Sequence, residues 1–337
     1  MKEYKLALVG ATGVVGREAR KVLEEMKLPI SEYIFMASSR SAGSTIEFMG
    51  KEYVVQELNE HSFDEHIDFA VFSAGGGTSK QFSPIAAAHG CVVVDNSSAF
   101  RMEEDVPLVV PEVNAKESFN NKGIIANPNC STIQAVVPLK ALDDKYKIKR
   151  VVYSTYQAVS GAGKAGIEDL ENGIDNYVTH EKYELKKFPH EIFNNCLPDI
   201  DICLENGYTK EEEKMVNETR KILGKPNLPV TATCVRVPVF NSHSESINVE
   251  FENEFDLDEL KDVLKKAPNV IVQDNLEEHV YPLAEEATGT NEVYVGRIRR
   301  DFSVKNGINF WCVADNIRKG AATNALQIVK YMIENEK

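Results

Sequence analysis

A cysteine at the junction of a strand and a helix is the residue of this sequence most clearly placed to do chemistry. Cys130 lies in the stretch 127–132 (NPNCST), which closes an apolar run at 123–126 and opens an apolar-periodic segment at 131–142 that predicts a helix. The first turn of a helix offers backbone N–H groups and the positive end of the helix dipole, and both lower the pKa of a thiol. Cys130 is therefore a candidate nucleophile, the alternative being a small buried residue at a turn.

The remaining cysteines do not suggest a metal or disulfide site. The six cysteines are far apart in the sequence, without a C-x-x-C pair, so neither a zinc site nor a disulfide framework is indicated. Cys91, Cys234 and Cys312 lie in apolar, strand-like runs, where we expect them to be buried and inert. No bound metal is therefore expected.

Length and charge limit the possible partners. A chain of 337 residues is too long for one ordinary core, so two domains are expected. The net charge of −14 argues against nucleic acid or an anionic membrane surface as a partner, because either needs a basic patch. No apolar run reaches membrane-spanning length and the chain starts directly with a strand, so a cytoplasmic protein is expected. An anionic substrate would need basic residues concentrated locally.

The N-terminal region has the pattern of a dinucleotide-binding turn. An apolar strand at 5–9 is followed by the turn 10–16 (GATGVVG) and a helix at 14–26. Glycines in this position let the backbone approach a pyrophosphate at the helix N-terminus. The next strand, 33–37, ends at Ser38-Ser39-Arg40, where an NAD site would carry an acidic residue. Hydroxyls and a guanidinium suit a 2′-phosphate, which favours NADP; a solvated polar loop is the alternative.

Further strand and helix alternation extends this first domain. A hairpin is predicted at 45–48 and 52–55, at the edge of the sheet. The strand 68–72 runs into a second glycine-rich turn, 73–78 (SAGGGT), before a helix at 79–88. The strand 91–94 leads to Arg101, which in such folds faces the crevice; a surface ion pair is the alternative.

After Cys130 the alternation loosens, and a second, α+β domain on one largely antiparallel or mixed sheet is predicted. A third glycine-rich corner, 157–163, follows its first long strand. Strands are predicted at 150–160, 229–240, 246–252, 291–300 and 307–314, and helices at 167–187, 208–224, 257–266 and 319–335.

Seven motifs in order give the whole chain a resemblance to the aspartate-β-semialdehyde dehydrogenase family. The related N-acetyl-glutamyl-phosphate reductases share the architecture but typically carry a His-Pro-Gly-Cys-type turn, which the stretch around Cys130 fits poorly. The motifs are at 10–16 (GATGVVG), 96–101 (NSSAFR), 127–132 (NPNCST), 156–163 (YQAVSGAG), 211–220 (EEEKMVNETR), 236–243 (RVPVFNSH) and 315–320 (DNIRKG).

The resemblance implies roles for particular residues. It makes Cys130 the catalytic nucleophile, His243 the acid/base group and Gln157 the residue that orients the intermediate. It assigns the substrate to a second group of residues, with Arg236 for the carboxylate, and Arg101, Lys214 and the nearby Asn129 for the phosphate. Glu211 either contacts the amino group of the substrate or positions the basic residues around it.

The cofactor implied is NADP. The cofactor-binding residues expected from the turns and the resemblance are Gly10, Thr12, Gly13, Val14, Val15, Ser38, Ser39, Arg40, Gly75, Gly76, Thr78, Asn96, Ser160, Gly161, Gly163, Asn316 and Lys319. The resemblance also implies that the C-terminal helix returns to the nucleotide domain and that the protein is a homodimer or a dimer of dimers.

The expected fold class is therefore α/β, with two domains. A Rossmann-like NADP-binding domain, 1–127, is completed by the helix 318–337, and a catalytic and dimerisation α+β domain spans 128–317. The expected reaction is NADPH-dependent reductive dephosphorylation of L-4-aspartyl phosphate through a cysteine thioester, in lysine, methionine and threonine biosynthesis. The alternatives are an N-acetyl-glutamyl-phosphate reductase, an acyl-CoA reductase of the same superfamily, or a non-catalytic NADP-binding homologue.

Overall fold

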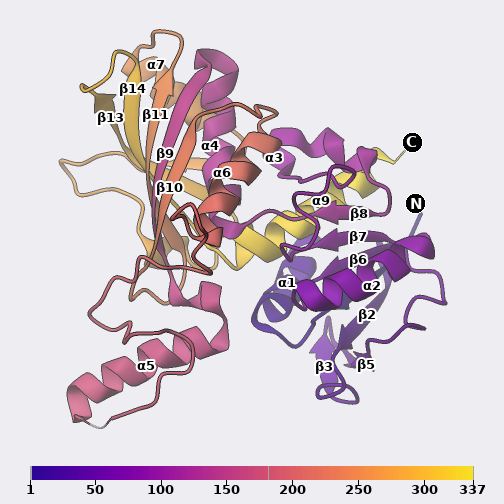
Figure 1. The fold of residues 1–337 in the computed structure, drawn as a ribbon. Coiled ribbons are helices and arrows are strands. Elements are labelled where there is room, and N and C mark those ends of the chain that lie inside the picture. The colour runs from indigo at the N-terminus through magenta and orange to yellow at the C-terminus, as the bar shows by residue number, and fades with distance from the viewer. Residues whose placement is uncertain (1, 181, 337) are drawn as a thin grey trace. The chain divides into compact units, whose positions relative to one another are not determined.

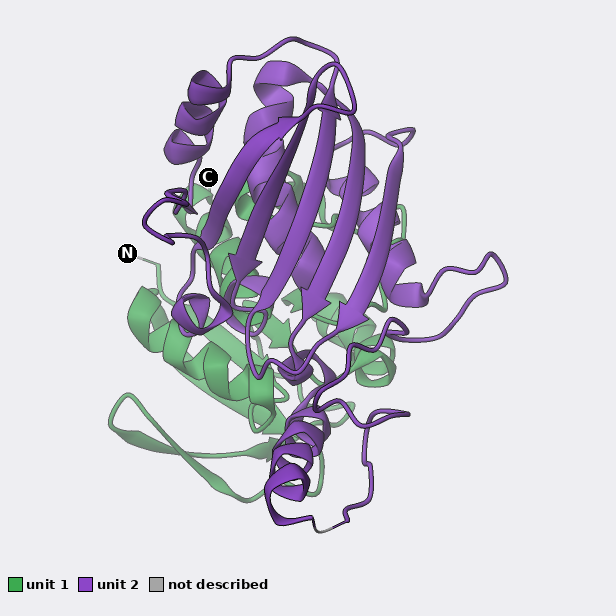
Figure 2. Cartoon of the chain, turned by 90° about the vertical axis from the view of Figure 1, so that its left-hand side faces the viewer, with its two compact units in different colours: residues 1–129, 321–337 green, residues 130–320 purple. Residues whose placement is uncertain are grey.

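The computed structural model describes residues 2–180 and 182–336, and the chain divides into two compact units. Unit 1 contains residues 1–129 and 321–337, and unit 2 contains residues 130–320 (Figure 2). The C-terminal segment thus belongs to the same unit as the N-terminal strands, and Cys130 is the first residue of unit 2.

Unit 1 is built on a six-stranded sheet in which every strand is parallel to its neighbours. Side chains alternate along β1, so that Leu6 and Leu8 enter one core while Ala7 and Val9 enter another. In spatial order the strands are β5 (Gln56–Glu57), β2 (Ile30–Ala37), β1 (Tyr4–Val9), β6 (Phe69–Phe72), β7 (Val92–Asp95) and β8 (Ile124–Ala126).

Helices cover both faces of this sheet (Figure 1). Helices α1 (Val14–Met26) and α9 (Thr323–Asn335) pack on one face, where Leu23 and Leu326 share a core with Leu8. Helix α2 (Gly76–Ala88) packs on the other face, where Ala86 joins the second core. Two short helical segments, α3 (Pro111–Asn114) and η1 (Ala115–Asn120), precede β8. This is the doubly wound arrangement that the sequence predicted.

The strand order reverses between β1 and β6. Helix α1 connects β1 to β2 on one side, and helix α2 connects β6 to β7 on the other. Two glycines let the chain pack tightly at this point. A Cβ on Gly10, whose φ is +85°, would lie 2.4 Å from the Ser73 carbonyl oxygen, and a Cβ on Gly16 would lie 2.2 Å from the Gly10 oxygen. In open α/β sheets, ligands bind outside the carboxyl ends of the strands at such a reversal.

Unit 2 is built on a six-stranded mixed sheet, as predicted. Its two outermost pairs, β10 with β9 and β12 with β13, are parallel, and the pairs between them are antiparallel. In spatial order the strands are β10 (Val230–Arg236), β9 (Ile148–Gln157), β11 (His243–Phe251), β14 (Gly307–Ala314), β13 (Val293–Asp301) and β12 (Val270–Val272).

One face of the unit 2 sheet is covered by helices (Figure 1). Helix α4 (Cys130–Tyr146) crosses β9, β11, β13 and β14, α6 (Lys210–Ile222) packs on β10, and α7 (Leu257–Lys266) packs on β12. In Figure 2 the opposite face carries no helix in front of its strands. The strand β11 shows the resulting alternation, because every second residue from His243 onward is buried. Further elements of this unit are the helix α5 (Lys164–Thr179) and the short segments η2 (Val159–Ala162) and α8 (Ala284–Ala287).

Several predicted boundaries are wrong. The helix predicted at 167–187 ends at Thr179, because His180 adopts a left-handed conformation; its residue 181 lies outside the described residues. The strand predicted to begin at residue 246 begins at His243, so this residue is part of the sheet. The hairpin β3 (Thr45–Phe48) and β4 (Lys51–Val54) forms its own sheet, and the unpredicted β5 is the edge strand.

The ends of three further predicted elements also differ from the structure. The strands predicted at 150–160 and 229–240 stop at Gln157 and Arg236, where the chain turns. The final helix is preceded by a π-helical turn, Arg318–Ala322. Among the described residues, no helix is both long enough and apolar enough to cross a membrane.

Candidate active site

Three predicted site residues come from adjacent strands and lie in one row across the inner face of the unit 2 sheet. Arg236 pairs with Gln157 in the parallel register of β10 and β9. Ser244 pairs with Tyr156 in the antiparallel register of β11 and β9, which puts His243 beside Gln157. The exposed fractions of Arg236, Gln157 and His243 are 7%, 1% and 0%. Sheet register therefore assembles residues that are up to about 90 positions apart in the chain.

Cys130 is the first residue of α4, the helix that packs on this face. Its neighbour Ser131 accepts a hydrogen bond of 2.7 Å from Gln157 Nε2. The absence of a side chain at Gly320 leaves room for Cys130, since a Cβ on residue 320 would lie 2.8 Å from Cys130 Cβ. Burial lowers the pKa of Arg236, and the negative charges of Glu211 and the Cys130 thiolate act in the opposite direction. Cys130 is partly exposed, so the structure brings an accessible sulfur near the row.

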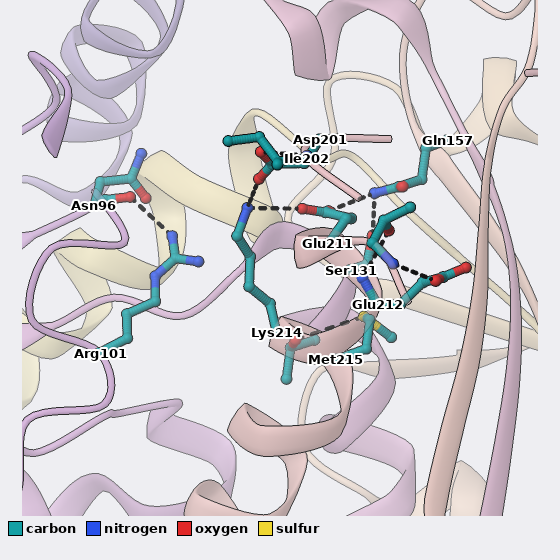
Figure 3. A network of polar contacts seen from close by, with 12 residues as sticks. Asn96, Arg101, Ser131, Gln157, Asp201, Ile202, Glu211, Glu212, Lys214 and Met215 are labelled. Atoms are coloured by element: carbon teal, nitrogen blue, oxygen red, sulfur yellow. Dashed lines mark hydrogen bonds and ion pairs between the residues drawn. The ribbon is translucent and has the colours of Figure 1, made fainter. Parts of the chain in front are cut away.

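A chain of polar contacts extends from Gln157 to the surface (Figure 3). Gln157 Nε2 donates to Glu211 Oε1 at 3.0 Å, and Lys214 Nζ donates to Glu211 Oε2 at 3.0 Å and to Asp201 Oδ2 at 2.7 Å. Burial lowers the pKa of Lys214, but the two carboxylates outweigh it, so the pKa is raised and the side chain is a cation. Glu211 and Lys214, both predicted, are thus joined to Gln157.

A capping box sets the position of Glu211. The Thr209 side chain accepts a hydrogen bond from the Glu212 N–H, and the Glu212 carboxylate accepts one from the Thr209 N–H, so that α6 starts at Lys210. Glu212 Oε1 also accepts a hydrogen bond from Cys234 N at 3.1 Å, which ties this helix start to β10. The first turn of α6 is therefore held against the strand that carries Arg236.

His243 has a fixed tautomer. The Ala158 N–H donates to Nδ1 at 3.0 Å, so Nδ1 carries a lone pair, and we assign the proton of the neutral ring to Nε2. Complete burial and the nearby Arg236 lower the pKa of His243 to about 3. Nε2 is buried and has no hydrogen-bond partner among the described residues. The ring therefore presents a single N–H donor, which it can offer to a ligand oxygen.

Gly161 is required by the packing of this row. A Cβ on Gly161 would lie 2.9 Å from Arg236 Nη1 and 3.2 Å from His243 Cε1. Arg236 Nη1 donates to the Ala158 carbonyl at 2.8 Å, so the same turn positions both side chains. Gly163, with φ of +78°, is the N-cap of α5.

Two residues predicted to bind the cofactor, Ser160 and Asn316, form a hydrogen bond with each other. Asn316 Nδ2 donates to Ser160 Oγ at 3.1 Å, and Asn316 Oδ1 accepts a hydrogen bond from Ser242 N at 2.9 Å. Ser242 has φ of +68° and immediately precedes His243. Asn316 therefore stabilises the turn that leads into β11. Lys319 lies in the π-helical turn and is fully buried.

A second polar row lies below the first on the same sheet face. Glu245, two residues after His243, pairs with Thr155 on β9 and Cys312 on β14. Both carboxyl oxygens of Glu245 and the Thr155 hydroxyl are buried without a hydrogen-bond partner among the described residues. Burial and the nearby Glu211 raise the pKa of Glu245, which favours its neutral, protonated form. The nearby Cys234 and Cys312 are buried, as is Cys91, which confirms the burial predicted for these three cysteines.

In unit 1 a separate set of predicted residues forms a network. Arg101 Nε donates to the Asn127 carbonyl at 2.9 Å, and Nη2 donates to the Asn96 carbonyl at 3.0 Å (Figure 3). Asn127 Nδ2 donates to Asn96 Oδ1 at 2.7 Å, and Asn324 Nδ2 donates to Asn127 Oδ1 at 2.7 Å. Two backbone carbonyls are thus among the partners that hold Arg101. Asn129, also buried, is the last residue of this unit before α4.

The glycine-rich turns of unit 1 fit the phosphates of a dinucleotide. Helix α1 has Gly13 as its N-cap and α2 has Gly75, and neither helix has a side-chain cap or an acidic residue in its first turn. Both helix N-termini follow neighbouring strands at the point of reversal, so their dipoles favour an anion there. The other predicted residues of these turns are Thr12, Val14, Val15, Gly76 and Thr78.

The residues predicted for the 2′-phosphate follow β2, the neighbour of β1. Ser38, Ser39 and Arg40 are all exposed in a turn at its carboxyl end. Thr12 Oγ1 donates to Ser41 Oγ at 3.3 Å, which links this turn to the first glycine-rich turn. A guanidinium at this place suits a phosphate on the adenosine ribose.

Sequence reasoning missed three participants in unit 2. Ser131 and Asp201 were not predicted as site residues, although both belong to the chain of contacts through Gln157 and Lys214. Glu245 was also missed, although the two-residue period of a strand puts it on the same face as His243. Asp201 lies in a loop, and no sequence pattern connects it to Lys214.

Comparison with known families agrees with this reading. Residues 5–121 match the family described as semialdehyde dehydrogenase, NAD binding domain, and residues 139–319 match semialdehyde dehydrogenase, dimerisation domain. The first match supports a nicotinamide dinucleotide as cofactor, and the second supports a homodimer. Together with the doubly wound unit, they define the class as a nicotinamide-nucleotide-dependent oxidoreductase and confirm the predicted fold class.

Individual relatives specify the family. An aspartate-semialdehyde dehydrogenase of Aquifex aeolicus is 56% identical over 334 residues, which cover 98% of both chains. The crystal structure of aspartate semialdehyde dehydrogenase II from Vibrio cholerae, complexed with ASA, superposes with a TM-score of 0.97 at 44% identity over 100% of both chains. The Candida albicans enzyme with NADP gives a TM-score of 0.75 at 26% identity over 98% of both chains. The chain belongs to the aspartate-semialdehyde dehydrogenase family, which confirms the predicted resemblance.

We predict that His243 stays neutral, with its proton on Nε2, from pH 5 to pH 8. The Ala158 N–H occupies the Nδ1 lone pair, and the pKa of about 3 lies below this range. Nitrogen-15 NMR of histidine-labelled protein, with His243→Asn used to assign the resonance, measures the tautomer directly. A ring that titrates within this pH range, or that carries its proton on Nδ1, would contradict the assignment.

We predict that Glu245→Gln changes the pH dependence of stability. Because the pKa of Glu245 is raised in the folded state, the unfolded state loses the proton first as the pH rises above about 4.3, and the native protein loses stability up to the folded pKa. The Gln variant lacks this loss. In urea unfolding at pH 5, 6, 7 and 8, its free energy of unfolding should rise relative to that of the parent protein, by at most about 1.4 kcal/mol per pH unit and only up to the folded-state pKa of Glu245.

The matched control for this experiment is Glu250→Gln. Glu250 lies on the same strand, but its side chain is 19% exposed and forms an ion pair with Lys149 at 2.6 Å. It therefore controls for the loss of one carboxyl group from β11. If the difference between Glu245→Gln and the parent protein does not depend on pH, Glu245 is ionised in the native state.

Proposed function

We propose that this protein catalyses the NADPH-dependent reductive dephosphorylation of L-4-aspartyl phosphate to L-aspartate 4-semialdehyde, a step toward lysine, methionine and threonine. The observation that carries the proposal is the row of Arg236, Gln157 and His243 next to the helix that begins with Cys130. Membership of the aspartate-semialdehyde dehydrogenase family supports it. We assign aspartyl phosphate as the substrate and aspartate semialdehyde as the product because the relatives are named aspartate-semialdehyde dehydrogenases.

The first step is acyl transfer to the sulfur. The Cys130 thiolate attacks the acyl carbon, the carbon–oxygen bond to phosphate breaks, and inorganic phosphate leaves with the bonding electrons. The start of α4 and the Nε2–H of His243 stabilise negative charge on the carbonyl oxygen as the tetrahedral intermediate forms. Gln157, held by Ser131 and Glu211, orients the bound acyl group.

The second step reduces the thioester. Bound NADPH would supply a hydride to the acyl carbon. The resulting oxyanion collapses to the aldehyde and expels the Cys130 thiolate, so this step needs no net proton transfer. A neutral His243 that donates a hydrogen bond to the oxygen is sufficient for it, and we propose this role in place of the acid/base role that the family resemblance implied.

The substrate's two anionic groups are assigned to separate cations. Arg236 binds the α-carboxylate through the donors it does not use on Ala158, since a guanidinium suits bidentate carboxylate recognition. Arg101, Lys214 and Asn129 bind the phosphate, and Glu211 binds the amino group. These assignments carry over the roles expected from the sequence, and the polar contacts within each unit support them.

NADP is proposed as the cofactor, in preference to NAD, because the turn after β2 carries Arg40 and two serines where NAD proteins have an acidic residue. The Candida albicans relative with bound NADP supports this choice. A homodimer or dimer of dimers in the cytoplasm is proposed as the working form, supported by the match of unit 2 to a dimerisation domain.

The decisive assay is phosphate-dependent reduction of NADP by the purified protein. Aspartate semialdehyde should be oxidised, and N-acetylglutamate semialdehyde should be a poor substrate. A preference for the acetylated compound would replace the proposed function with that of an N-acetyl-glutamyl-phosphate reductase. No turnover of either compound would favour a non-catalytic role.

We predict that Cys130→Ala lowers kcat by at least about 10⁴-fold, because no other group replaces the nucleophile. NADP binding, measured by fluorescence titration, should change less than about twofold, because the glycine-rich turns are intact. Cys196→Ala is the control, because this exposed thiol lies outside the contacts described above. Substantial turnover by Cys130→Ala would refute the assignment of the nucleophile.

We predict that Arg40→Ala weakens NADP binding by about tenfold while NAD binding changes less than about twofold, because only NADP carries the phosphate that the guanidinium pairs with. Calorimetric titration of both nucleotides measures this difference. Lys21→Ala is the control, since this lysine lies on α1 in an ion pair with Glu18 at 2.9 Å. Equal losses for the two nucleotides would count against the 2′-phosphate assignment.

A further inference from the structure

Lys214, the proposed phosphate-binding lysine of unit 2, already has two carboxylate partners. Its Nζ lies 2.7 Å from Asp201 Oδ2 and 3.0 Å from Glu211 Oε2 (Figure 3). Two negative charges therefore outnumber the single positive charge at this place. A phosphate dianion that approached this cluster unchanged would meet a net negative charge, so one carboxylate has to leave the ammonium group before the anion binds.

Of the two carboxylates, Asp201 is the one that can leave. The Glu211 side chain is 8% exposed and also accepts a hydrogen bond from Gln157, so moving it would disrupt the catalytic row. The Asp201 side chain is 29% exposed, and among the described residues its other carboxylate oxygen accepts only the N–H of the next residue, Ile202. Asp201 has φ of +73°, a left-handed conformation that aspartate and asparagine adopt more readily than most residues.

Asp201 also borders a cavity of suitable chemistry. A cavity of about 260 Å³ in unit 2 is lined by Asp201, Arg236 and Lys187, and by Asp199 and Phe188. Asp201 thus contacts Lys214 and also lines a space whose wall carries two cations, Lys187 and Arg236, and one further carboxylate, Asp199.

We propose that Asp201 is a specificity-determining residue: its carboxylate is an internal competitor that holds Lys214 until a doubly charged phosphoryl group displaces it. The proposal rests on the proposed function, in which Lys214 binds phosphate. A monoanion gains little by exchange, because it offers the ammonium group the same charge as a carboxylate that is tethered and always present. A dianion offers twice the charge and therefore wins the exchange. Asp201 in this way selects dianions and weakens the affinity for all anions.

The test is Asp201→Asn in the full-length protein. Asparagine tolerates the left-handed conformation and keeps an oxygen that accepts the Ile202 N–H, so the loop is preserved while the competing charge is lost. Calorimetric titration with inorganic phosphate should show binding about tenfold tighter than in the parent protein. Nitrate, a monoanion, should bind measurably to the variant and not to the parent. In the phosphate-dependent assay the KM for phosphate should fall several-fold, with kcat unchanged or lower.

Asp199→Asn is the matched control. Asp199 lines the same cavity and lies two residues away, but it makes no ion pair with a described residue. An equal gain in phosphate affinity from both variants would mean a general charge effect and would overturn the proposal. Unchanged or weaker phosphate binding by Asp201→Asn would also overturn it, because Asp201 would then only position Lys214.

The phosphate-binding result for Asp201→Asn can be interpreted separately from the activity assay that tests the proposed function. If the protein does not oxidise aspartate semialdehyde but Asp201→Asn alone binds phosphate more tightly, the proposed function fails and the competitor role of Asp201 stands. If turnover occurs and the variant binds phosphate like the parent, the function stands and the role of Asp201 is refuted.

Discussion

The register of the unit 2 sheet is the constraint on which the candidate active site depends. Arg236, Gln157 and His243 are the last or first residues of three strands, and they form a row only because β10, β9 and β11 pair in one register. A slip of one residue in any strand would turn its site residue to the opposite face. Helix α4 covers this face and begins at Cys130, so the same packing that buries the sheet brings the sulfur to the row.

The polar contacts of unit 2 connect charge binding to this row. Isolated charges at these depths would be costly, and the structure pairs them in a chain that runs from Ser131 through Gln157 and Glu211 to Lys214. Each member fixes the next, so Gln157 is oriented by a carboxylate and Glu211 by a cation. A change at the Lys214 end of the chain therefore reaches the amide that lies beside His243.

The sequence predicted the chemistry of the site better than its connections. Cys130 was expected from its place at a helix start, whereas Gln157 and His243 were expected from the family resemblance; helix α1 was predicted to the residue because apolar spacing and glycines mark its start. The start of β11 was missed because Asn241, Ser242 and Ser244 hide the strand period. The roles of Asp201 and of the Ala158 N–H depend on where a loop and a turn fold back, and neighbouring sequence does not encode that position.

The neutral state of His243 fits a site in which Arg236 and Lys214 supply the positive charge and His243 supplies a hydrogen-bond donor. A cationic imidazole is not needed to stabilise the Cys130 thiolate, because the start of α4 already does so. It would also stand beside Arg236, whose charge opposes protonation of the ring. With His243 neutral, Arg236 and Lys214 carry the positive charge near this row, and in the proposed function they bind the carboxylate and the phosphate of the substrate. The single Nε2–H is left for the oxygen whose charge grows in the transition state, where stabilisation increases the rate.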